Sequence, residues 1–386
     1  MHRMAVSRTP RLSWEDARRL FPVTERWAYL DHACVSPISL AVHQAMTAHL
    51  GDVLADGDVN ASRWDRMVEG ARRDGATLLG CRPEEVAFLK NTSEGISLVA
   101  AGLDWRPGDN VVSAQGEFPA NIYPWMARAR CGVELRLVAE RDGRIPYRDV
   151  RDAIDGHTRV LALSFVEFLS GFRHNVARLG ELCRRRGVLF VLDAIQGLGA
   201  LSLNVSEAGV HFASADAHKW LLGPEGSALF FCRRECLELL GAPMVGWRSV
   251  PKSSTYLPYH FTLRPDAARF ELGTTNTVGI AGLARAVTLL LAVGLPTIER
   301  RIKLLTDRLC RGLARLGADV LSSRRAGEWS GIVSFRLPGA DLKAVARRLR
   351  QEGIVLSYRL GWLRVSPHFY NSEAEVDRLL EALRGG

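Results

Sequence analysis

The sequence predicts an α/β protein whose large domain is built on a mainly parallel sheet and is followed by a smaller C-terminal α/β domain. Between about residues 80 and 235, short apolar runs alternate with helical segments, which is the order that builds parallel βαβ units. After Gly273 the pattern changes to long helical segments and then to a second alternation of strands and helices. No internal repeat or long Pro/Ser-rich linker separates the two parts, so we expect them to be tightly joined.

The clearest strands of the large domain are predicted at residues 160–166 and 188–192. Both are nearly continuous apolar runs, as expected for strands whose two faces are covered by helices. Between them, residues 176–186 carry Leu179 and Leu182 at helical spacing. Strand, helix and strand therefore follow one another in the order of a βαβ unit.

The C-terminal part begins with helical patterns at residues 281–295 and 298–316. Shorter segments then alternate between strand and helix, at 332–337, 342–350, 355–358, 363–366 and 373–383. This alternation indicates a second, smaller α/β domain.

The start of the chain carries a helix signal of its own. Ser13 and Asp16 fit the capping box of a short helix, and we expect this stretch to pack on the small domain. The chain then divides into an N-terminal segment (1–35), a large domain (36–270) and a small domain (271–386).

The composition is that of an ordinary globular protein, with 47% hydrophobic and 24% charged residues among 386. The longest mainly apolar run, at residues 286–295, is broken by Thr288 and Gly294 and is far shorter than the roughly 20 residues of a membrane-spanning helix. Residues 1–12 contain arginines but lack the apolar core of a signal peptide. We therefore expect a cytoplasmic protein with no membrane segment.

Neither a metal site nor a disulfide framework is expected. The seven cysteines are an odd number, and they are scattered without a CxxC pair or a histidine cluster at metal-ligand spacing. The net charge of +9 raises the alternative of a nucleic-acid partner. However, the basic runs at 184–186 and 347–350 fall on polar faces of predicted helices beside acidic residues, which is typical of solvated surface. No nucleic-acid partner is expected.

Lys219 is the first candidate for chemistry. It lies between the apolar runs 210–213 and 227–232, in a turn that contains glycine and proline, with His218 and Trp220 on either side. A lysine that is desolvated beside another cationic group has a lowered pKa, which Schiff-base chemistry requires. A structural lysine remains the alternative on this segment alone.

Asp193 is the second candidate. It closes the predicted strand 188–192, so its carboxylate emerges at the carboxyl end of a parallel strand, where open α/β sheets bind ligands. An aspartate there commonly caps a helix. Together with Lys219, which follows 219 − 193 = 26 residues later, it fits pyridoxal phosphate (PLP), whose ring nitrogen needs a carboxylate partner.

The segment Asp193-Ala-Ile-Gln196, followed by Ala217-His218-Lys219-Trp220, resembles the class V aminotransferase family, which includes cysteine desulfurases, selenocysteine lyase, kynureninase and isopenicillin N epimerase. The resemblance covers nearly the whole chain. Further matching blocks are Tyr29-Leu-Asp-His-Ala, Asn91-Thr-Ser-Glu-Gly, Glu117-Phe-Pro-Ala-Asn, Arg269-Phe-Glu-Leu-Gly-Thr-Thr-Asn and Leu363-Arg-Val-Ser-Pro-His-Phe-Tyr-Asn. It implies the fold-type I architecture with a mainly parallel seven-stranded sheet, PLP as cofactor and an amino acid as substrate.

The resemblance also implies how the cofactor is held. Lys219 forms the Schiff base, Asp193 faces the ring nitrogen, Phe118 lies over the ring, and Gln196 hydrogen-bonds the phenolic oxygen. For Phe118 the alternative is ordinary core packing.

The phosphate is implied to lie between two segments. Thr92 and Ser93 precede a helical pattern, whose N-terminus attracts anions, although the alternative is a simple N-cap. His218 and Ser214 approach from the other side. Many relatives carry a serine where this chain has Asp216, and two anions repel, so the role of Asp216 is left open.

Thr274 resembles a residue that reaches the phosphate of the neighbouring subunit. If that holds, the enzyme is a homodimer with shared sites.

The substrate is expected to contact His32 and Arg364. Arg364 lies in an apolar stretch, where an unpaired arginine is costly, and bidentate binding of the substrate carboxylate satisfies it. An internal salt bridge to Glu373 or Glu375 is the alternative. Trp247 and Arg248 are available to shape the pocket, and a second carboxylate at Arg248 or Arg359 is left open.

In most relatives the freed lysine removes the Cα proton, after which the reactions diverge. Cysteine desulfurases carry a sulfur-accepting thiol shortly before the carboxylate-binding arginine, whereas residues 358–363 contain no cysteine and Cys310 is the nearest one upstream. For Cys34 two roles are open. Its side chain either faces the pocket or, as is commoner for a cysteine, packs among other side chains in the protein interior.

We therefore expect a carbon–sulfur or carbon–selenium lyase without that persulfide cysteine. An aminotransferase or an amino-acid epimerase is the alternative, and a non-catalytic scaffold that binds anions or nucleic acid is a remote one.

Overall fold

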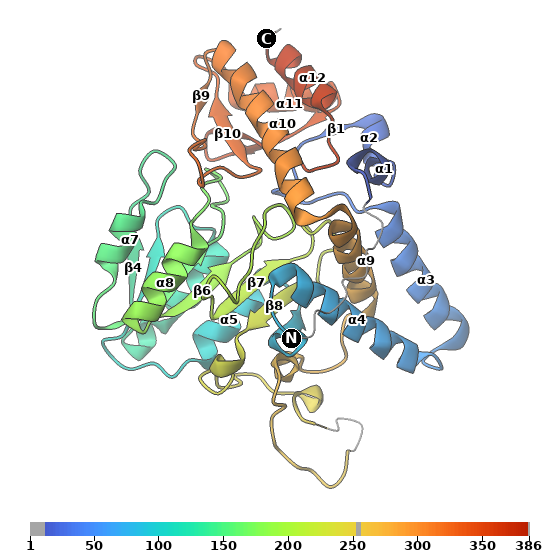
Figure 1. Cartoon of the computed structure of the whole chain (residues 1–386), viewed down its shortest axis with the longest axis vertical. Helices are drawn as coiled ribbons and strands as arrows, with labels where there is room; N and C mark the ends of the chain where they lie inside the picture. The colour runs from blue at the N-terminus through green and yellow to red at the C-terminus, as the bar shows by residue number, and fades with distance from the viewer. Residues whose placement is uncertain (1–11, 252–255, 385–386) are drawn as a thin grey trace, which may run out of the picture.

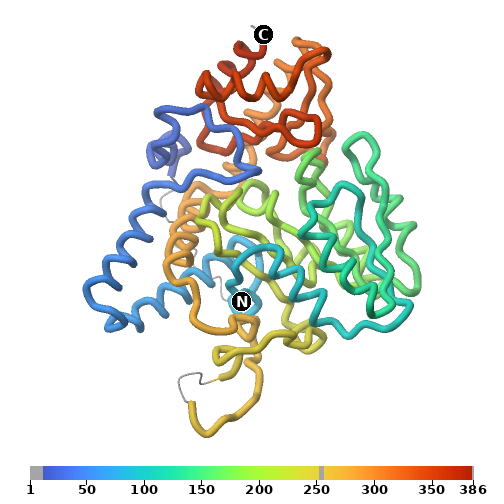
Figure 2. The backbone as a smooth tube through the Cα atoms, turned by 180° about the vertical axis from the view of Figure 1, so that it is seen from behind, coloured from blue at the N-terminus to red at the C-terminus, as the bar shows by residue number. Residues whose placement is uncertain are grey.

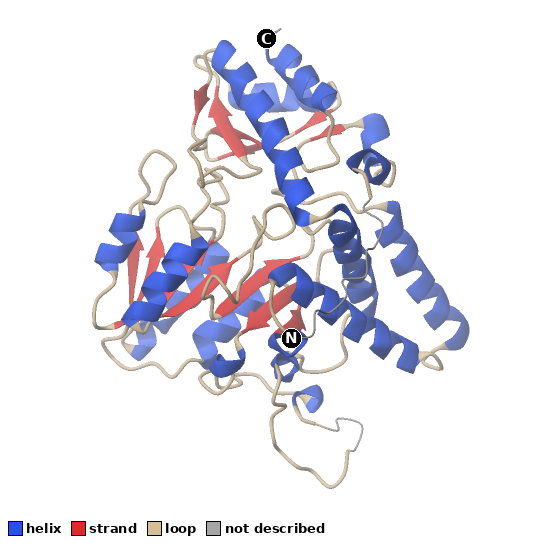
Figure 3. Ribbon diagram, viewed as in Figure 1, coloured by secondary structure: helices blue, strands red, loops and turns tan. Residues whose placement is uncertain are grey.

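The computed structural model describes residues 12–251 and 256–384, and its centre is a seven-stranded sheet with the order β2-β8-β7-β6-β5-β3-β4 (Figures 1 and 3). The strands are β2 (Val86–Leu89), β3 (Asn110–Ala114), β4 (Glu134–Val138), β5 (Thr158–Ser164), β6 (Leu189–Asp193), β7 (Phe212–Asp216) and β8 (Ala228–Cys232). β8 runs antiparallel to both neighbours, and the other adjacent pairs are parallel. The predicted α/β fold with a mainly parallel seven-stranded sheet is confirmed.

Helices cover both faces of this sheet (Figure 3). The helices of the large domain are α3 (Leu40–Asp56), α4 (Ala61–Leu79), α5 (Thr92–Gly102), α6 (Tyr123–Met126), α7 (Tyr147–Ala153), α8 (Val176–Arg186) and α9 (Thr277–Val293). Of these, α3 packs on α9 and not on the sheet. Successive residues of β5 alternate between two apolar cores, with Leu161 and Leu163 in one and Val160 and Ala162 in the other. Burial on both faces explains why these strands read as continuous apolar runs.

The predicted βαβ unit is present as β5, α8 and β6. Asn175 caps α8 by accepting a hydrogen bond from the N–H of Arg178, and Gly187 ends the helix with a φ of +65°. Short 3₁₀ turns lie in the connections, at η1 (Pro83–Glu85), η2 (Pro119–Asn121), η3 (Ala127–Cys131), η4 (Arg234–Cys236), η5 (Trp247–Ser249) and η6 (Ala267–Phe270).

The small domain forms the top of the molecule in Figure 1 and has a core of its own. Its antiparallel sheet has the order β12-β13-β10-β9. The elements are α10 (Leu295–Arg315), β9 (Asp319–Val320), β10 (Val333–Arg336), α11 (Leu342–Gln351), β11 (Ile354–Val355), β12 (Ser357–Arg359), β13 (Trp362–Val365) and α12 (Glu373–Arg384).

The N-terminal segment lies against the small domain (Figure 2). After α1 (Trp14–Arg18) and α2 (Val23–Arg26), β1 (Ala28–Tyr29) pairs in parallel with β11. Ser13 caps α1 by accepting a hydrogen bond from the N–H of Asp16. The part of the prediction that concerns residues 1–11 lies outside the described residues.

The position of α9 differs from the predicted division at residue 271. This helix packs along α3 and α4 beside the large sheet, and Gly294 separates it from α10, which enters the small domain. The apolar residues of α9 therefore belong to the core of the large domain.

Within residues 12–251 and 256–384, no single helix is long and apolar enough to cross a membrane, and α9 and α10 pass that test only as a pair bent by 80°. The same residues contain no group of three or more His, Cys, Asp and Glu side chains placed to hold a metal ion. All seven cysteines are described, and all are free thiols.

Candidate active site

A cavity of about 400 Å³ lies where the carboxyl ends of the central strands meet the small domain and the N-terminal segment. Parallel α/β sheets bind ligands at this edge, because the strand-to-helix loops gather there. Eight of the predicted site residues line the cavity: Thr92, Ser93, Phe118, Asp193, Gln196, His218, Lys219 and Arg364.

Lys219 lies in the turn that follows β7. Its Nζ is 5.5 Å from the centre of the Phe118 ring, and no hydrogen bond from Nζ is present among the described residues. Burial lowers the pKa of Lys219, and the nearby Asp193 carboxylate opposes this effect. The amine therefore faces the cavity with its proton weakly held, as a nucleophile or base requires.

The Lys219 turn is fixed by the N-terminal segment. Ser36 donates its N–H to the carbonyl of His218 at 2.7 Å and its hydroxyl to the carbonyl of Lys219 at 2.5 Å. The chain on either side of Ser36 is therefore held at a set distance from the amine.

Asp193 ends β6, and its side chain is 1% exposed. Its Oδ1 accepts a hydrogen bond from the N–H of Ile195 at 3.0 Å, whereas Oδ2 has no hydrogen-bond partner. Burial raises the pKa of Asp193 to about 6. A buried carboxylate oxygen without a partner is costly, so the site is suited to a cationic N–H supplied by a ligand.

The N-terminus of α5 opens into the same cavity. Asn91 caps it by accepting from the N–H of Glu94 at 2.9 Å, and the hydroxyl of Thr92 accepts from the N–H of Asp216 at 3.0 Å. The free N–H groups of this first turn, together with Ser93, suit an anion.

Ser214 lies behind this helix and does not line the cavity. It is buried on β7 beneath Gly95, where an added Cβ would lie 2.4 Å from its hydroxyl oxygen. Ser214 lies close to Gly95 in the first turn of α5 and is not one of the residues that line the cavity. Its contact with the phosphate stays a prediction.

His218 and Asp216 face one another across the cavity edge, with Nδ1 and Oδ1 3.1 Å apart. The Asp216 carboxylate, which would repel a phosphate, therefore lies next to the imidazole of His218.

Gln196 connects three segments. Its amide nitrogen donates to the carbonyl of Ala33 at 3.0 Å, and its oxygen accepts from the indole of Trp220 at 2.9 Å. One amide hydrogen remains for a ligand, because a side-chain amide has two donors.

Phe118 is 46% exposed, which excludes the alternative of core packing. Its ring meets the ring of Phe168 edge to face at 5.4 Å. One face of Phe118 is therefore available to a flat ligand in the cavity.

Arg364, on β13, is 2% exposed. Its Nη1 donates to the carbonyl of Phe168 at 2.8 Å, its Nη2 lies 3.5 Å from Oδ1 of Asp31, and its Nε has no partner. Burial lowers the pKa of Arg364, and Asp31 opposes this effect. The guanidinium is thus only partly satisfied by the protein.

The predicted alternative partners of Arg364 are engaged elsewhere. Glu373 pairs with Arg301, and Glu375 pairs with Arg18. The partner that was missed, Asp31, belongs to the Tyr29-Leu-Asp-His-Ala block, which was assigned to the substrate-facing segment.

His32 is placed differently from the prediction. It has no exposed surface, and its ring nitrogens contact the carbonyl of Ser366 at 2.8 Å and the hydroxyl of Tyr370 at 2.6 Å. Burial and His368 lower the pKa of His32 well below its usual range. In this conformation His32 joins the N-terminal segment to the small domain instead of reaching the cavity.

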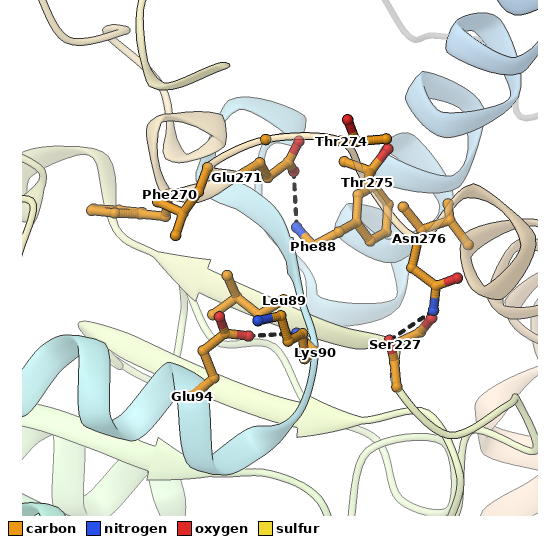
Figure 4. A pocket seen from close by; sticks show the side chains of 14 residues that line it. Phe88, Leu89, Lys90, Glu94, Ser227, Phe270, Glu271, Thr274, Thr275 and Asn276 are labelled. Atoms are coloured by element: carbon orange, nitrogen blue, oxygen red, sulfur yellow. Dashed lines mark hydrogen bonds between the residues drawn. The ribbon is translucent and has the colours of Figure 1, made fainter. Parts of the chain in front are cut away.

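Thr274 lines another pocket, of about 390 Å³, with Lys90, Glu94 and Asn276 (Figure 4). In this pocket Asn276 donates to the carbonyl of Gly226 at 3.0 Å. Thr274 is therefore not a wall of the Lys219 cavity of its own chain.

Trp247 and Arg248 also lie outside the Lys219 cavity. They form η5, which contacts η6, and the N–H of Arg248 donates to the carbonyl of Leu272. They do not shape the cavity as the sequence suggested.

Cys34 and Arg359 do line the cavity. Nη2 of Arg359 donates to Sγ of Cys34 at 3.3 Å. Cys34 is thus not a buried packing residue, contrary to the commoner outcome considered for it.

The residues around this cavity fit PLP. The unpartnered Oδ2 of Asp193 matches a pyridinium N–H, the first turn of α5 matches a phosphate, and the Lys219 amine matches an aldehyde. Between them, Phe118 offers an aromatic face. The other buried carboxylate that lines the cavity, Asp216 at the end of β7, lies 3.1 Å from Nδ1 of His218.

The family model "Aminotransferase class-V" matches residues 28–379 of the chain. A probable cysteine desulfurase of Methanothermobacter thermautotrophicus is 29% identical, with 96% of this chain and 97% of that protein covered. A cysteine desulfurase of Klebsiella pneumoniae is 30% identical, with 96% of this chain and 98% of that protein covered.

Solved structures agree. The apo structure of a cysteine desulfurase from Thermococcus onnurineus is 28% identical and has a TM-score of 0.88. The match covers 99% of this chain and 99% of that chain. A mutant of C-DES with glycine covalently linked to its PLP cofactor has a TM-score of 0.89 at 24% identity, over 95% of this chain and 98% of that chain, which shows the shared fold.

Proposed function

The chain belongs to the class-V aminotransferase family, a family of PLP-dependent enzymes, and we propose that it removes sulfur from L-cysteine or a closely related thiol or selenol amino acid. The observation that carries the proposal is the set of unsatisfied groups around one cavity: the Lys219 amine, Oδ2 of Asp193 and Nε of Arg364. The cysteine desulfurases among the relatives, which align over nearly the whole chain, support sulfur chemistry over the other reactions of the family.

PLP, when bound, withdraws electrons from the substrate Cα. Asp193 would hold the proton of the ring nitrogen, Phe118 would lie against the ring, and the free amide hydrogen of Gln196 would reach the phenolic oxygen. The N–H groups at Thr92 and Ser93, with His218, would hold the phosphate, and Ser214 would support that turn from below. The positions of these residues in and behind the cavity support these roles.

Lys219 would act as the base. With PLP and an amino acid bound, the Lys219 amine would remove the Cα proton and return a proton later. Because burial lowers the pKa of Lys219, more of it is in the neutral, proton-accepting form near neutral pH.

Arg364 would bind the substrate carboxylate. Nε is free, and Nη2 is only 3.5 Å from Asp31, so a carboxylate would replace a weak contact with a bidentate one. Asp31, whose pKa is raised by burial, would then retain its hydrogen bond with Ser357.

We also propose a homodimer. Thr274 lies in a second pocket of its own chain and is free of the Lys219 cavity, as a residue that serves a neighbouring subunit would be (Figure 4). Size measurement in solution tests this, and a monomeric active enzyme would contradict it.

The reaction is tested with the purified enzyme, PLP and L-cysteine in the presence of a thiol reductant. Alanine and sulfide are expected in equal amounts, and borohydride reduction should attach the cofactor to the peptide that contains Lys219. Lys219→Ala should lower turnover by about 10³-fold or more, because both the attachment and the base are lost.

The same assay separates the alternatives. A keto acid that retains its sulfur would indicate transamination, and loss of optical activity without sulfide would indicate epimerisation. Either result, or full turnover by Lys219→Ala, would overturn the proposal.

A further inference from the structure

Cys34 occupies an unusual place for a free cysteine. It lines the Lys219 cavity, it is partly exposed, and Arg359 donates a hydrogen bond to its Sγ at 3.3 Å. Lys219 and Arg364 line the same cavity as Cys34. The sulfur therefore lies close to the amine and the guanidinium together.

The backbone fixes this position. Two residues after Cys34, Ser36 makes hydrogen bonds to the carbonyls of His218 and Lys219, at 2.7 and 2.5 Å. One residue before it, the carbonyl of Ala33 accepts the amide of Gln196 at 3.0 Å. Cys34 is thus held between contacts to the lysine turn and to the β6 loop.

The cavity is a ligand site independently of the cysteine. Oδ2 of Asp193, a side chain that is 1% exposed, and Nε of Arg364, a side chain that is 2% exposed, are both buried without hydrogen-bond partners. Both residues line the same cavity as Cys34. Buried polar atoms of this kind indicate a bound polar molecule, because they are costly when left unsatisfied.

No other cysteine has access to this cavity. All seven cysteines are described, and Cys34 is the member that lines it. The turn before Arg364 is a tight one, in which Leu360 and Gly361 have φ angles of +47° and +86°, and it joins β12 directly to β13. This hairpin leaves no loop on which a thiol could be carried toward the cavity.

We propose that Cys34 is the sulfur acceptor of this enzyme, delivered from the N-terminal segment and not from the loop before Arg364. This inference rests on the proposed action on L-cysteine. A substrate held by its carboxylate at Arg364 and by its amine near Lys219 would lie in the same cavity as Sγ of Cys34.

The transfer is balanced without an outside oxidant. The Cys34 sulfur, as a thiolate, attacks the substrate sulfur and an S–S bond forms while the substrate Cβ–S bond breaks. The electron pair of that bond passes to the substrate carbon skeleton, which takes up a proton at Cβ and leaves as alanine. The two sulfurs are oxidised to a persulfide as the carbon is reduced, and Arg359 remains beside the sulfur anion.

The first measurement uses the wild-type holoenzyme. It is mixed with one equivalent of L-cysteine without reductant, digested under non-reducing conditions, and the cysteine peptides are examined by mass spectrometry. We expect one added sulfur atom on the Cys34 peptide and one alanine released per site. This measurement does not depend on the folding of any variant.

The second measurement compares Cys34→Ser and Cys34→Ala with Cys310→Ser, a cysteine on α10 that does not line the cavity. The Cys34 variants should retain the cofactor and its spectral change on addition of L-cysteine, but form alanine about 100-fold more slowly, because binding is intact and the nucleophile is lost. Cys310→Ser should keep the wild-type rate.

The outcomes separate the two proposals. If the wild type forms no alanine and no sulfide, the action on cysteine is wrong. If it forms alanine at the same rate in both Cys34 variants, or if the added sulfur is found on another cysteine, the action on cysteine stands and the role of Cys34 is wrong.

Discussion

Two buried arginines show how differently this protein treats the same side chain. Arg72 on α4 is 5% exposed and Arg364 on β13 is 2% exposed. Burial acts to lower the pKa of both. Glu271 and Glu69 overcome that effect and raise the pKa of Arg72 above its usual value, whereas Asp31 does not overcome it at Arg364, whose pKa is lowered.

The surroundings of Arg72 are complete. Its Nη1 and Nη2 donate to the two oxygens of Glu271 at 2.6 and 3.2 Å, Nη1 also donates to the carbonyl of Val86 at 2.7 Å, and Nε donates to Glu69. Glu271 in turn accepts the N–H of Phe88 at 2.9 Å (Figure 4). This cluster joins α4, β2 and the segment after η6.

The surroundings of Arg364 are incomplete, and the gap faces a cavity. The difference teaches that burial of a charge does not identify a functional site, whereas a buried charge with unused donors beside a cavity does. The same distinction separates Oδ2 of Asp193, which has no partner, from the saturated Gln196 oxygen.

The largest effect is expected at the complete site. Arg72→Met leaves Glu271 buried without its cation, and the free energy of unfolding should fall by about 3–5 kcal/mol. The KM for L-cysteine of the protein that still folds should be unchanged. Chemical denaturation and steady-state kinetics measure both, with Arg73→Met, an exposed neighbour on α4, as the control. A large rise in KM with unchanged stability would break the comparison.

At Arg364 we expect the opposite result, a large change in KM and a small change in stability. Arg364→Met removes the carboxylate contact, and the KM for L-cysteine should rise about 100-fold, which is roughly 2.7 kcal/mol. The melting temperature should change little, because a buried cation disappears and Asp31 can take up a proton.

A substrate analogue makes this prediction more specific. Cysteamine lacks the carboxylate. The ratio of kcat/KM for L-cysteine to kcat/KM for cysteamine should therefore be far smaller for Arg364→Met than for the wild type. The exposed Arg347 on α11 provides the control as Arg347→Met. Unchanged discrimination would mean that Arg364 is an internal ion-pair residue.

The effect with the strongest pH dependence is expected at Asp193, in protein prepared without cofactor. Because burial raises the pKa of Asp193 from 3.8 to about 6, ionising it costs more in the folded than in the unfolded protein. Its contribution to the free energy of unfolding therefore falls as pH rises from about 4 to about 6. Asp193→Asn should make the cofactor-free protein more stable by up to about 3 kcal/mol above pH 6 and no more stable below pH 4.

Thermal unfolding at a series of pH values measures this difference. In the presence of PLP the sign should reverse, because the wild-type carboxylate then gains its partner and the asparagine does not. A variant that is less stable at every pH without cofactor would show that Asp193 is a structural residue.

The sequence was most informative where side chains leave the ends of strands. Asp193 and Lys219 were predicted at carboxyl ends of buried strands, and the fold brings these ends together along one edge of the sheet. The apolar runs determine the strands, and the strand order determines the edge.

It was less informative where the direction of a side chain depends on packing. Ser214 and His32 stand in matching blocks, yet Ser214 lies under Gly95, and His32 turns toward Tyr370. Asp31 and Cys34 lie in that same N-terminal block, and no local pattern distinguishes the residue that pairs with Arg364 from the one that lines the cavity.

By itself, the sequence predicted the α/β class from its periodicity and placed Lys219 and Asp193 at strand ends, because these are local properties of the chain. The roles of the two residues came from the resemblance to the class V aminotransferases. The tertiary structure alone decided which residues meet: α9 joined the large domain, Asp31 met Arg364, and Cys34 came to the cavity. The physical reason is that each of these contacts joins residues far apart in the chain, so it depends on how complete layers pack and not on any one segment's preference.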